Sequence, residues 1–83
     1  MKRYRAMKRS TQGWTHDVVV GLLCGFGFES KQGSEHTICF DPEDKANAVQ
    51  IPRHRAVKGY VVELTTSAIE QKLKREGLNA DGK

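Results

Sequence analysis

The sequence has no long hydrophobic run and only two cysteines, and each of these absences excludes a class of protein. No apolar run approaches the roughly 18 residues that a membrane-spanning helix needs, and the mean hydropathy is −0.61. Cys24 and Cys39 show neither a CxxC spacing nor a histidine pair at metal-ligand spacing, so the sequence predicts no disulfide framework and no metal site. We expect both to act as small buried or half-buried hydrophobic residues. Residues 1–12 have the positive charge of a secretory signal without its apolar core, so we expect a cytoplasmic protein without a membrane segment.

The 83 residues suffice for one small domain, and their charge is unevenly distributed. The net charge is +4, yet the basic residues of the first twelve positions have no acidic residue among them. We expect residues 1–13 to form a flexible basic arm in front of a single domain at residues 14–83. Such an arm favours phosphate backbones through counterion release, although a solvated tail without a ligand fits the same composition.

The periodicities of residues 14–83 predict an α+β domain. Thr15 can cap a first helix, which Gly25 and Gly27 end. Strands are expected at 28–31, 36–40 and 48–51, with the last two separated by an acidic turn that contains Pro42. The apolar stripe of the first helix consists of Trp14, Val18, Val19, Leu22, Leu23 and Phe26.

The second helix is expected to run to about Glu76, with Gly77 at its C-terminal end and frayed residues at 79–83. Its start stays open, because residues 61–64 are also β-competent and Ser67 with Glu70 can form a capping box. The order helix, three strands, helix predicts a three-stranded antiparallel sheet with both helices on one face, an arrangement like that of the double-stranded-RNA-binding domain.

In the second strand we expect Ile38 and Phe40 to pack on the core, with Thr37 and Cys39 on the other face. His36 is the first residue of this expected strand. The predicted topology brings it near Pro52 and directs both helix N-termini towards the same edge, where nearby arginines complete an anion site.

His36 is the candidate catalytic residue, because an imidazole changes its protonation near neutral pH and suits proton transfer. The alternative is a partly exposed strand histidine without a catalytic role. A Ser-His-Asp triad is not indicated, since Asp41 lies at the far end of the strand from Ser34 and His36. His16 is expected to be a surface residue on the first turn of its helix.

Several of these residues together resemble one known family. Gly33-Ser34-Glu35-His36, the acidic turn with Pro42, Ile51-Pro52-Arg53-His54 and an Ala68-Ile69 helix ending at Gly77-Leu78 are similar to the HicA toxin family. The resemblance covers about Trp14 to Leu78. It implies a fold like that of the double-stranded-RNA-binding domain and a metal-independent endoribonuclease, an mRNA interferase, that uses one histidine and is neutralised by a HicB antitoxin. The family's catalytic histidine corresponds to His36, and its proline-flanked histidine corresponds to His54.

The function predicted from the sequence is therefore cleavage of mRNA by a bacterial toxin, with His36 as general base or proton shuttle and no cofactor. His54 is the candidate for a second acid or base. The alternative is a non-catalytic RNA- or DNA-binding module that uses the same basic edge. The residues predicted to bind RNA phosphates are Lys31, Gly33, Ser34, Arg53 and Arg55.

Overall fold

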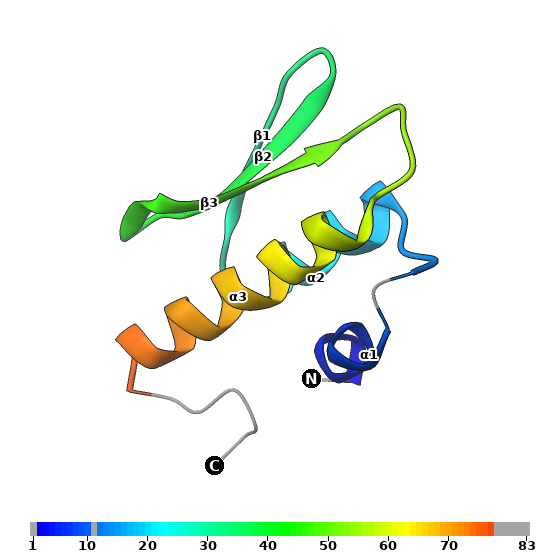
Figure 1. Ribbon diagram of the computed structural model, residues 1–83. Coiled ribbons are helices and arrows are strands. Elements are labelled where there is room, and N and C mark those ends of the chain that lie inside the picture. Colours follow the sequence, from blue (N-terminus) through cyan, green and yellow to red (C-terminus); the bar gives the residue numbers. More distant parts are fainter. Residues whose placement is uncertain (1, 11, 78–83) are drawn as a thin grey trace.

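A computed structural model describes residues 2–10 and 12–77 of the chain. A three-stranded antiparallel sheet forms one layer, two helices cover one face of it, and the N-terminal helix lies on the far side of these helices (Figure 1). From the second helix onward the order is α-β-β-β-α, which confirms the predicted α+β class. The expected fraying of residues 79–83 concerns positions outside the described part. The elements are α1 (Lys2–Arg9), α2 (His16–Gly25), β1 (Glu29–Gln32), β2 (His36–Asp41), β3 (Asp44–Pro52) and α3 (Gly59–Arg75).

The sheet has the strand order β1-β2-β3, so β2 is central and β3 is an edge strand. Cys39 pairs with Val49 and Thr37 pairs with Ile51, and all four side chains are buried. Because directly paired residues point to the same face, this is the face that the helices cover.

The predicted inward face of β2 is therefore wrong. Ile38 and Phe40 lie on the opposite, open face and are half-buried there. The predicted alternation within β2 is present, but pairing with Val49 and Ile51 of β3 decides which face is inside.

Helix α2 forms as predicted, with local signals at both ends. The Thr15 hydroxyl accepts a hydrogen bond from the Val18 amide at 3.4 Å, which caps the N-terminus. Gly27 has φ of +92°, and the amide of Phe28 reaches back to the Leu23 carbonyl at 3.0 Å, as in a Schellman motif. Val19 and Leu23 are fully buried beneath the sheet.

Helix α3 and strand β3 are both longer than predicted. The helix begins at Gly59, with Lys58 as its N-cap, which settles the start that the sequence left open. Val61 and Val62 are β-competent residues, yet both are buried in α3, because packing against the core outweighs their weak helix propensity. None of the helices in the described residues is long and apolar enough to cross a membrane.

The structure corrects the prediction of a flexible arm over residues 1–13, because residues 2–9 form α1. Tyr4 and Met7 are 2% and 1% exposed and belong to the core, and Tyr4 makes an edge-to-face contact with Phe26. Lys8 and the Tyr4 hydroxyl both donate to the Glu70 carboxylate of α3. These hydrogen bonds, first that from Tyr4, hold the pKa of Glu70 below its usual range.

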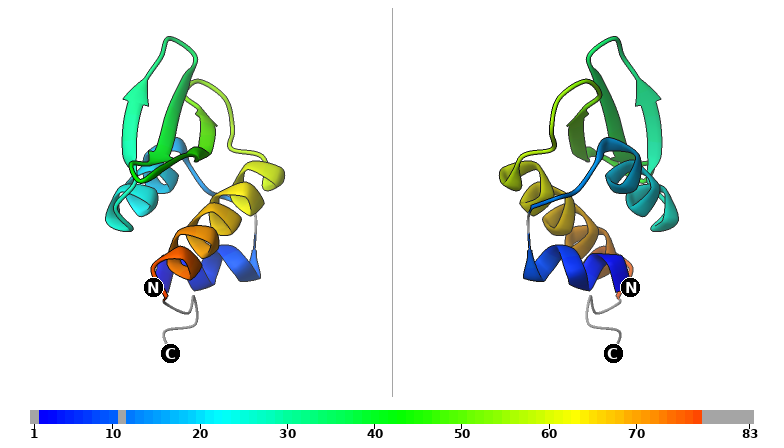
Figure 2. Two further views of the ribbon diagram at one scale, coloured as in Figure 1. Left: turned by 90° about the vertical axis from the view of Figure 1, so that its left-hand side faces the viewer. Right: turned by 90° about the vertical axis from the view of Figure 1, so that its right-hand side faces the viewer.

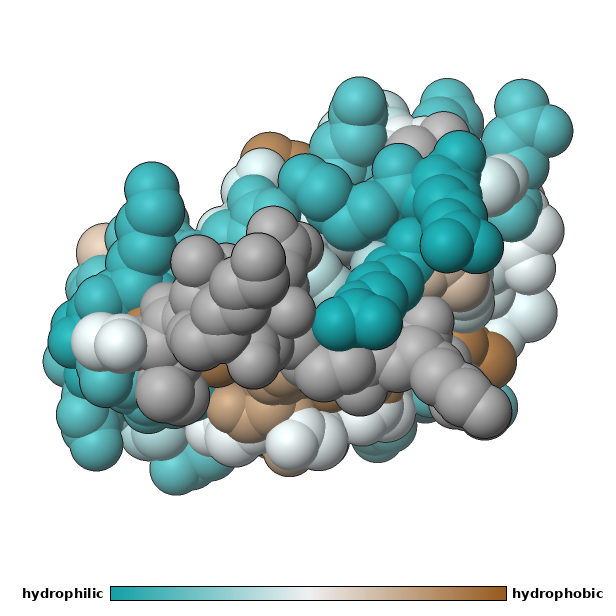
Figure 3. All heavy atoms as spheres, turned by 90° about the horizontal axis from the view of Figure 1, so that it is seen from below, coloured by the Kyte–Doolittle hydropathy of each residue, from teal (hydrophilic) through white to brown (hydrophobic). Residues whose placement is uncertain are grey.

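Three basic residues of α1 lie at the surface. Arg5, Lys8 and Arg9 are exposed, and two side views show α1 crossing beneath α3 on the side away from the sheet (Figure 2). Seen from below, the described atoms of this surface are mainly hydrophilic around a narrower hydrophobic strip (Figure 3). The sequence pattern of α1 is too short and too basic to reveal its two core residues.

The acidic turn between β2 and β3 joins the sheet to the end of α3. Arg75 donates to Asp41 at 2.6 Å and to Glu43 at 2.7 Å, and the Glu43 amide donates to Asp41 at 3.0 Å. Burial by itself would raise the pKa of Asp41, but the hydrogen bonds from the Glu43 amide and Arg75 lower it below its ordinary value of 3.8. These acidic residues therefore stabilise the fold at the end of the sheet opposite His36.

Asp41→Asn should lower the thermal midpoint at pH 7, because the fully buried carboxylate is replaced by a neutral amide beside Arg75. A carboxyl group whose pKa is lowered by folding stabilises the fold at pH values above its pKa in the unfolded state. This contribution disappears as the pH falls through the pKa of the folded state. The difference in midpoint between wild type and variant should therefore shrink when both are melted at decreasing pH below about 4. Glu43→Gln is the control, because that carboxylate is 71% exposed and should contribute little. A difference that stays constant down to about pH 2 would contradict this role.

Candidate active site

The turn before β2 is held in place by its own backbone and by Arg53. The Gly33 amide donates to the His36 carbonyl at 2.8 Å. Arg53 donates from its guanidinium to the Gly33 carbonyl at 2.6 Å and from its amide to the Glu35 carbonyl at 2.9 Å. A Cβ atom at position 33 would lie 3.1 Å from the His36 carbonyl oxygen, so the close turn favours glycine.

This turn presents His36 at the edge of a small pocket that also contains His54. His36 is the first residue of β2, lies opposite Pro52 of β3 as predicted, and is exposed. The pocket has a volume of about 240 Å³ and is lined by Glu35, His36, Pro52, His54 and Arg55. Two histidines, an arginine and a glutamate thus border one space at the end of the sheet.

Both sheet-facing helices point their N-termini to this end of the molecule, in agreement with the predicted topology. Trp14, His16 and Asp17 at the start of α2 line a second pocket together with Arg53 and Arg55. Lys58 and Tyr60 at the start of α3 line a third with His36 and Arg55. Arg55 borders all three pockets, so it stands where an anion would meet both helix N-termini.

The remaining predicted phosphate-binding residues are more dispersed. Gly33 and Ser34 form the turn itself, and Ser34 is exposed. Arg53 is half-buried and braces the turn, and it lines the pocket at α2 and not the pocket of the histidines. Lys31 is exposed on β1, where it pairs with Ile38 on the open face and does not line the histidine pocket.

Two residues that the sequence analysis did not single out also border this region. Glu35 stands between Ser34 and His36 and lines the histidine pocket. Tyr60 is 62% exposed and lines the pocket at the start of α3. Adjacency to His36 was an available signal for Glu35, whereas the position of Tyr60 follows only from the docking of α3.

A different histidine makes the hydroxyl–imidazole–carboxylate contact. One ring nitrogen of His16 lies 2.8 Å from the Asp17 carboxylate, and the other lies 2.7 Å from the Thr37 hydroxyl. His16 is thus half-buried and bonded, and the prediction of a plain surface residue is corrected. Thr37 is only 1% exposed, so its oxygen cannot meet a substrate. The contact serves to satisfy a buried hydroxyl on the inner face of β2.

His16→Ala should destabilise the protein by about 1–3 kcal/mol, because it leaves the buried Thr37 hydroxyl without a partner. Chemical denaturation of the variant measures this loss. The double variant His16→Ala with Thr37→Val should recover part of it, since the unsatisfied group is then removed. A single variant as stable as wild type would show that water replaces the imidazole.

The two cysteines differ in exposure. Cys39 is fully buried, and burial, with a smaller contribution from Cys24, raises the pKa of its thiol to about 12. Cys24 is exposed, which corrects the expectation of a buried or half-buried side chain, and both thiols are free. In the described residues no group of three or more histidine, cysteine or acidic side chains could hold a metal ion.

No family model, curated protein or solved structure matches the chain. The likeness to the HicA family therefore depends on the motifs around His36 and His54 and on the order of the elements.

Proposed function

We propose that this protein is a metal-independent endoribonuclease of the HicA type, which cleaves mRNA as the toxin of a toxin-antitoxin pair. The observation that supports it best is the pocket in which His36 and His54 lie together with Arg55. Two imidazoles can serve as general base and general acid near neutral pH. The guanidinium beside them suits a phosphate.

The proposed reaction is an attack of a ribose 2′-hydroxyl on the adjacent phosphorus. His36 takes the proton from the 2′-oxygen as the new P–O bond forms, and His54 gives a proton to the 5′-oxygen as its bond to phosphorus breaks. The products are a 2′,3′-cyclic phosphate and a 5′-hydroxyl, so no water and no cofactor is consumed. Each proton transfer is typically worth about 10²–10⁴ in rate.

Charge that develops on the phosphoryl oxygens has donors available nearby. Arg55 borders the histidine pocket and both helix N-termini, and the amides of a helix N-terminus favour an anion. Arg53 supports the same edge indirectly, because it holds the turn that carries His36. We extend the proposal to a cytoplasmic location and to a HicB-like antitoxin as partner, on the resemblance alone.

The second candidate function is a non-catalytic module that binds RNA or DNA through the same edge. It is favoured by the cluster of Arg53 and Arg55 at the start of α2, which needs no histidine chemistry to hold a phosphate. In that case His36 would be an exposed strand residue without a chemical role.

Incubation of the purified protein with a structured, end-labelled mRNA in the presence of EDTA distinguishes the two. The proposal expects fragments that end in a 2′,3′-cyclic phosphate and that form equally well with and without the chelator. Retardation of the RNA in a native gel without cleavage would favour the binding module. Cleavage that EDTA abolishes would overturn the metal-independent mechanism.

A further inference from the structure

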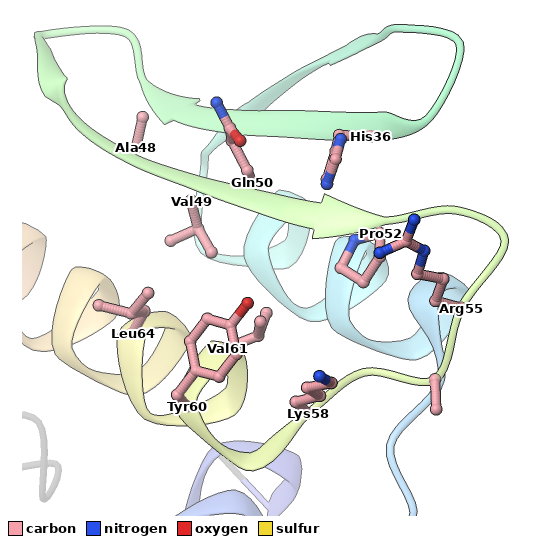
Figure 4. Close-up of a pocket in the computed structure, with 11 residues that line it drawn as sticks. His36, Ala48, Val49, Gln50, Pro52, Arg55, Lys58, Tyr60, Val61 and Leu64 are labelled. Carbon is pink, nitrogen blue, oxygen red and sulfur yellow. The ribbon is translucent and has the colours of Figure 1, made fainter.

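A groove of about 390 Å³ runs between the free edge of β3 and the first half of α3. Figure 4 shows Val49 of β3 pointing towards Tyr60 and Leu64 of α3 across this space, whereas Ala48 and Gln50 point to the other face of the strand. Strand β3 is nine residues long and pairs only with β2 in the described sheet. An edge strand of this kind presents unpaired N–H and C=O groups, which can pair with another strand.

The wall on the side of α3 is apolar although it faces solvent. Tyr60 and Leu64 are 62% and 53% exposed and are the exposed large hydrophobic residues of the described chain. They are four positions apart and so lie on one face of α3. Exposed apolar side chains that gather beside a groove mark a binding surface more often than scattered ones do.

One end of the groove is cationic. Arg55 lies on the β3 side of this end and Lys58 on the α3 side (Figure 4), and none of the groove-lining residues is acidic. The N-cap Lys58 makes no side-chain cap, so the first amides of α3 add their partial positive charge at the same end. The groove therefore combines strand-pairing groups and an apolar wall with a site for a carboxylate.

From these three features we propose that the groove binds an extended segment of another protein, which adds to β3 as a further strand. Its backbone pairs with the edge of β3, and its apolar side chains rest on Tyr60 and Leu64. An acidic side chain at one end of the segment meets Arg55 and Lys58. A groove between an edge strand and a helix is a recognised way of binding peptides, in which main-chain hydrogen bonds give affinity and alternate side chains give specificity.

A bound segment would also cover His36 and Arg55, which border both the groove and the histidine pocket. Partner binding and access of RNA to His36 are then mutually exclusive. This consequence rests on the proposed nuclease function, whereas binding of the segment itself does not.

The test selects ligands from a random library of nine-residue segments, the length of β3, each displayed within a carrier so that neither end is free. Selected sequences should alternate apolar residues and carry Asp or Glu at one end. A selected segment, synthesised with blocked ends, should bind in a fluorescence anisotropy titration. Every second amide of the segment pairs with β3. N-methylation of the amides at these positions should therefore abolish binding, and N-methylation of the amides between them should leave binding unchanged.

Leu64→Lys and Tyr60→Ala should each weaken binding by at least about tenfold, because the apolar wall is removed. Gln71→Lys is the matched control, since it adds the same charge at an exposed position of α3 outside the groove and should change nothing. All three positions are exposed, so the variants should keep the thermal midpoint of wild type.

Failure to select any alternating segment, or binding unaffected by Leu64→Lys, would overturn the proposal. A concentration-dependent dimer that Leu64→Lys abolishes would assign the groove to a second copy of this chain. Single-stranded RNA that binds through Tyr60 and Leu64 when no segment does would assign it to nucleic acid. A segment that binds yet leaves RNA cleavage unchanged would overturn the proposal that the segment excludes RNA from His36. If the protein has no nuclease activity, binding of the segment would still support the groove as its binding site.

Discussion

His36→Ala should lower the rate of RNA cleavage by about 10²–10⁴ while changing the free energy of unfolding by no more than about 0.5 kcal/mol. The expected loss of rate follows from the position of the ring, which lines the histidine pocket and is exposed to solvent. The small effect on stability follows from the same exposure, because an exposed side chain buries little surface on folding. Cleavage rate and thermal midpoint of the same preparation measure both.

Two further variants make the comparison specific. His54→Ala should also cost about 10²–10⁴ in rate if His54 is the acid that protonates the leaving oxygen, and much less if it only positions RNA. Lys31→Ala is the control, because Lys31 is exposed on the same sheet but lies outside the histidine pocket. Near-normal cleavage by a folded His36→Ala protein would rule out the assignment. A large drop in its midpoint would show that His36 is a structural residue.

Deleting residues 1–12 should abolish cooperative unfolding, because it removes Tyr4 and Met7 from the core. Met7→Ala alone should cost about 2–5 kcal/mol, the usual loss for truncating a buried large side chain. A core of this size has little stability to spare. Thermal melts followed by circular dichroism test both changes.

The charge of α1 can be examined without breaking the fold. Arg9→Gln removes a charge from an exposed side chain and should leave the midpoint unchanged. If Arg9 neutralises an RNA phosphate, the slope of log K against log salt should become shallower by up to about one unit in this variant.

If the protein without residues 1–12 melts like the wild type, that result would contradict the packing of α1 and would restore the idea of a free basic arm.

Local signals were enough to predict much of the framework of the site. The Thr15 cap, Gly27 with its positive φ and the acidic turn at Pro42 each act within a few residues, and all were found where expected. The pairing of His36 with Pro52 follows from these elements, since a hairpin with a short turn has little freedom of register. The proximity of His36 and His54 could therefore be predicted from the sequence.

Features that depend on distant partners could not be predicted in this way. The inward face of β2 carries Thr37 and Asp41, which can be buried only because His16 and Arg75 supply their hydrogen bonds. The start of α3 at Gly59 depends on packing of its valines, which by themselves favour a strand as much as a helix.

The sequence by itself determined the elements from α2 to α3, their order and the turn that presents His36, because these depend on caps, glycines and alternation within short stretches. Tertiary structure decided that Tyr4 and Met7 of α1 are part of the core, since α1 packs against α3 and Tyr4 contacts the ring of Phe26. It also decided which face of β2 is buried and where the groove beside β3 lies. Each of these is set by side chains far apart in sequence, whose contacts arise only when helices and sheet dock.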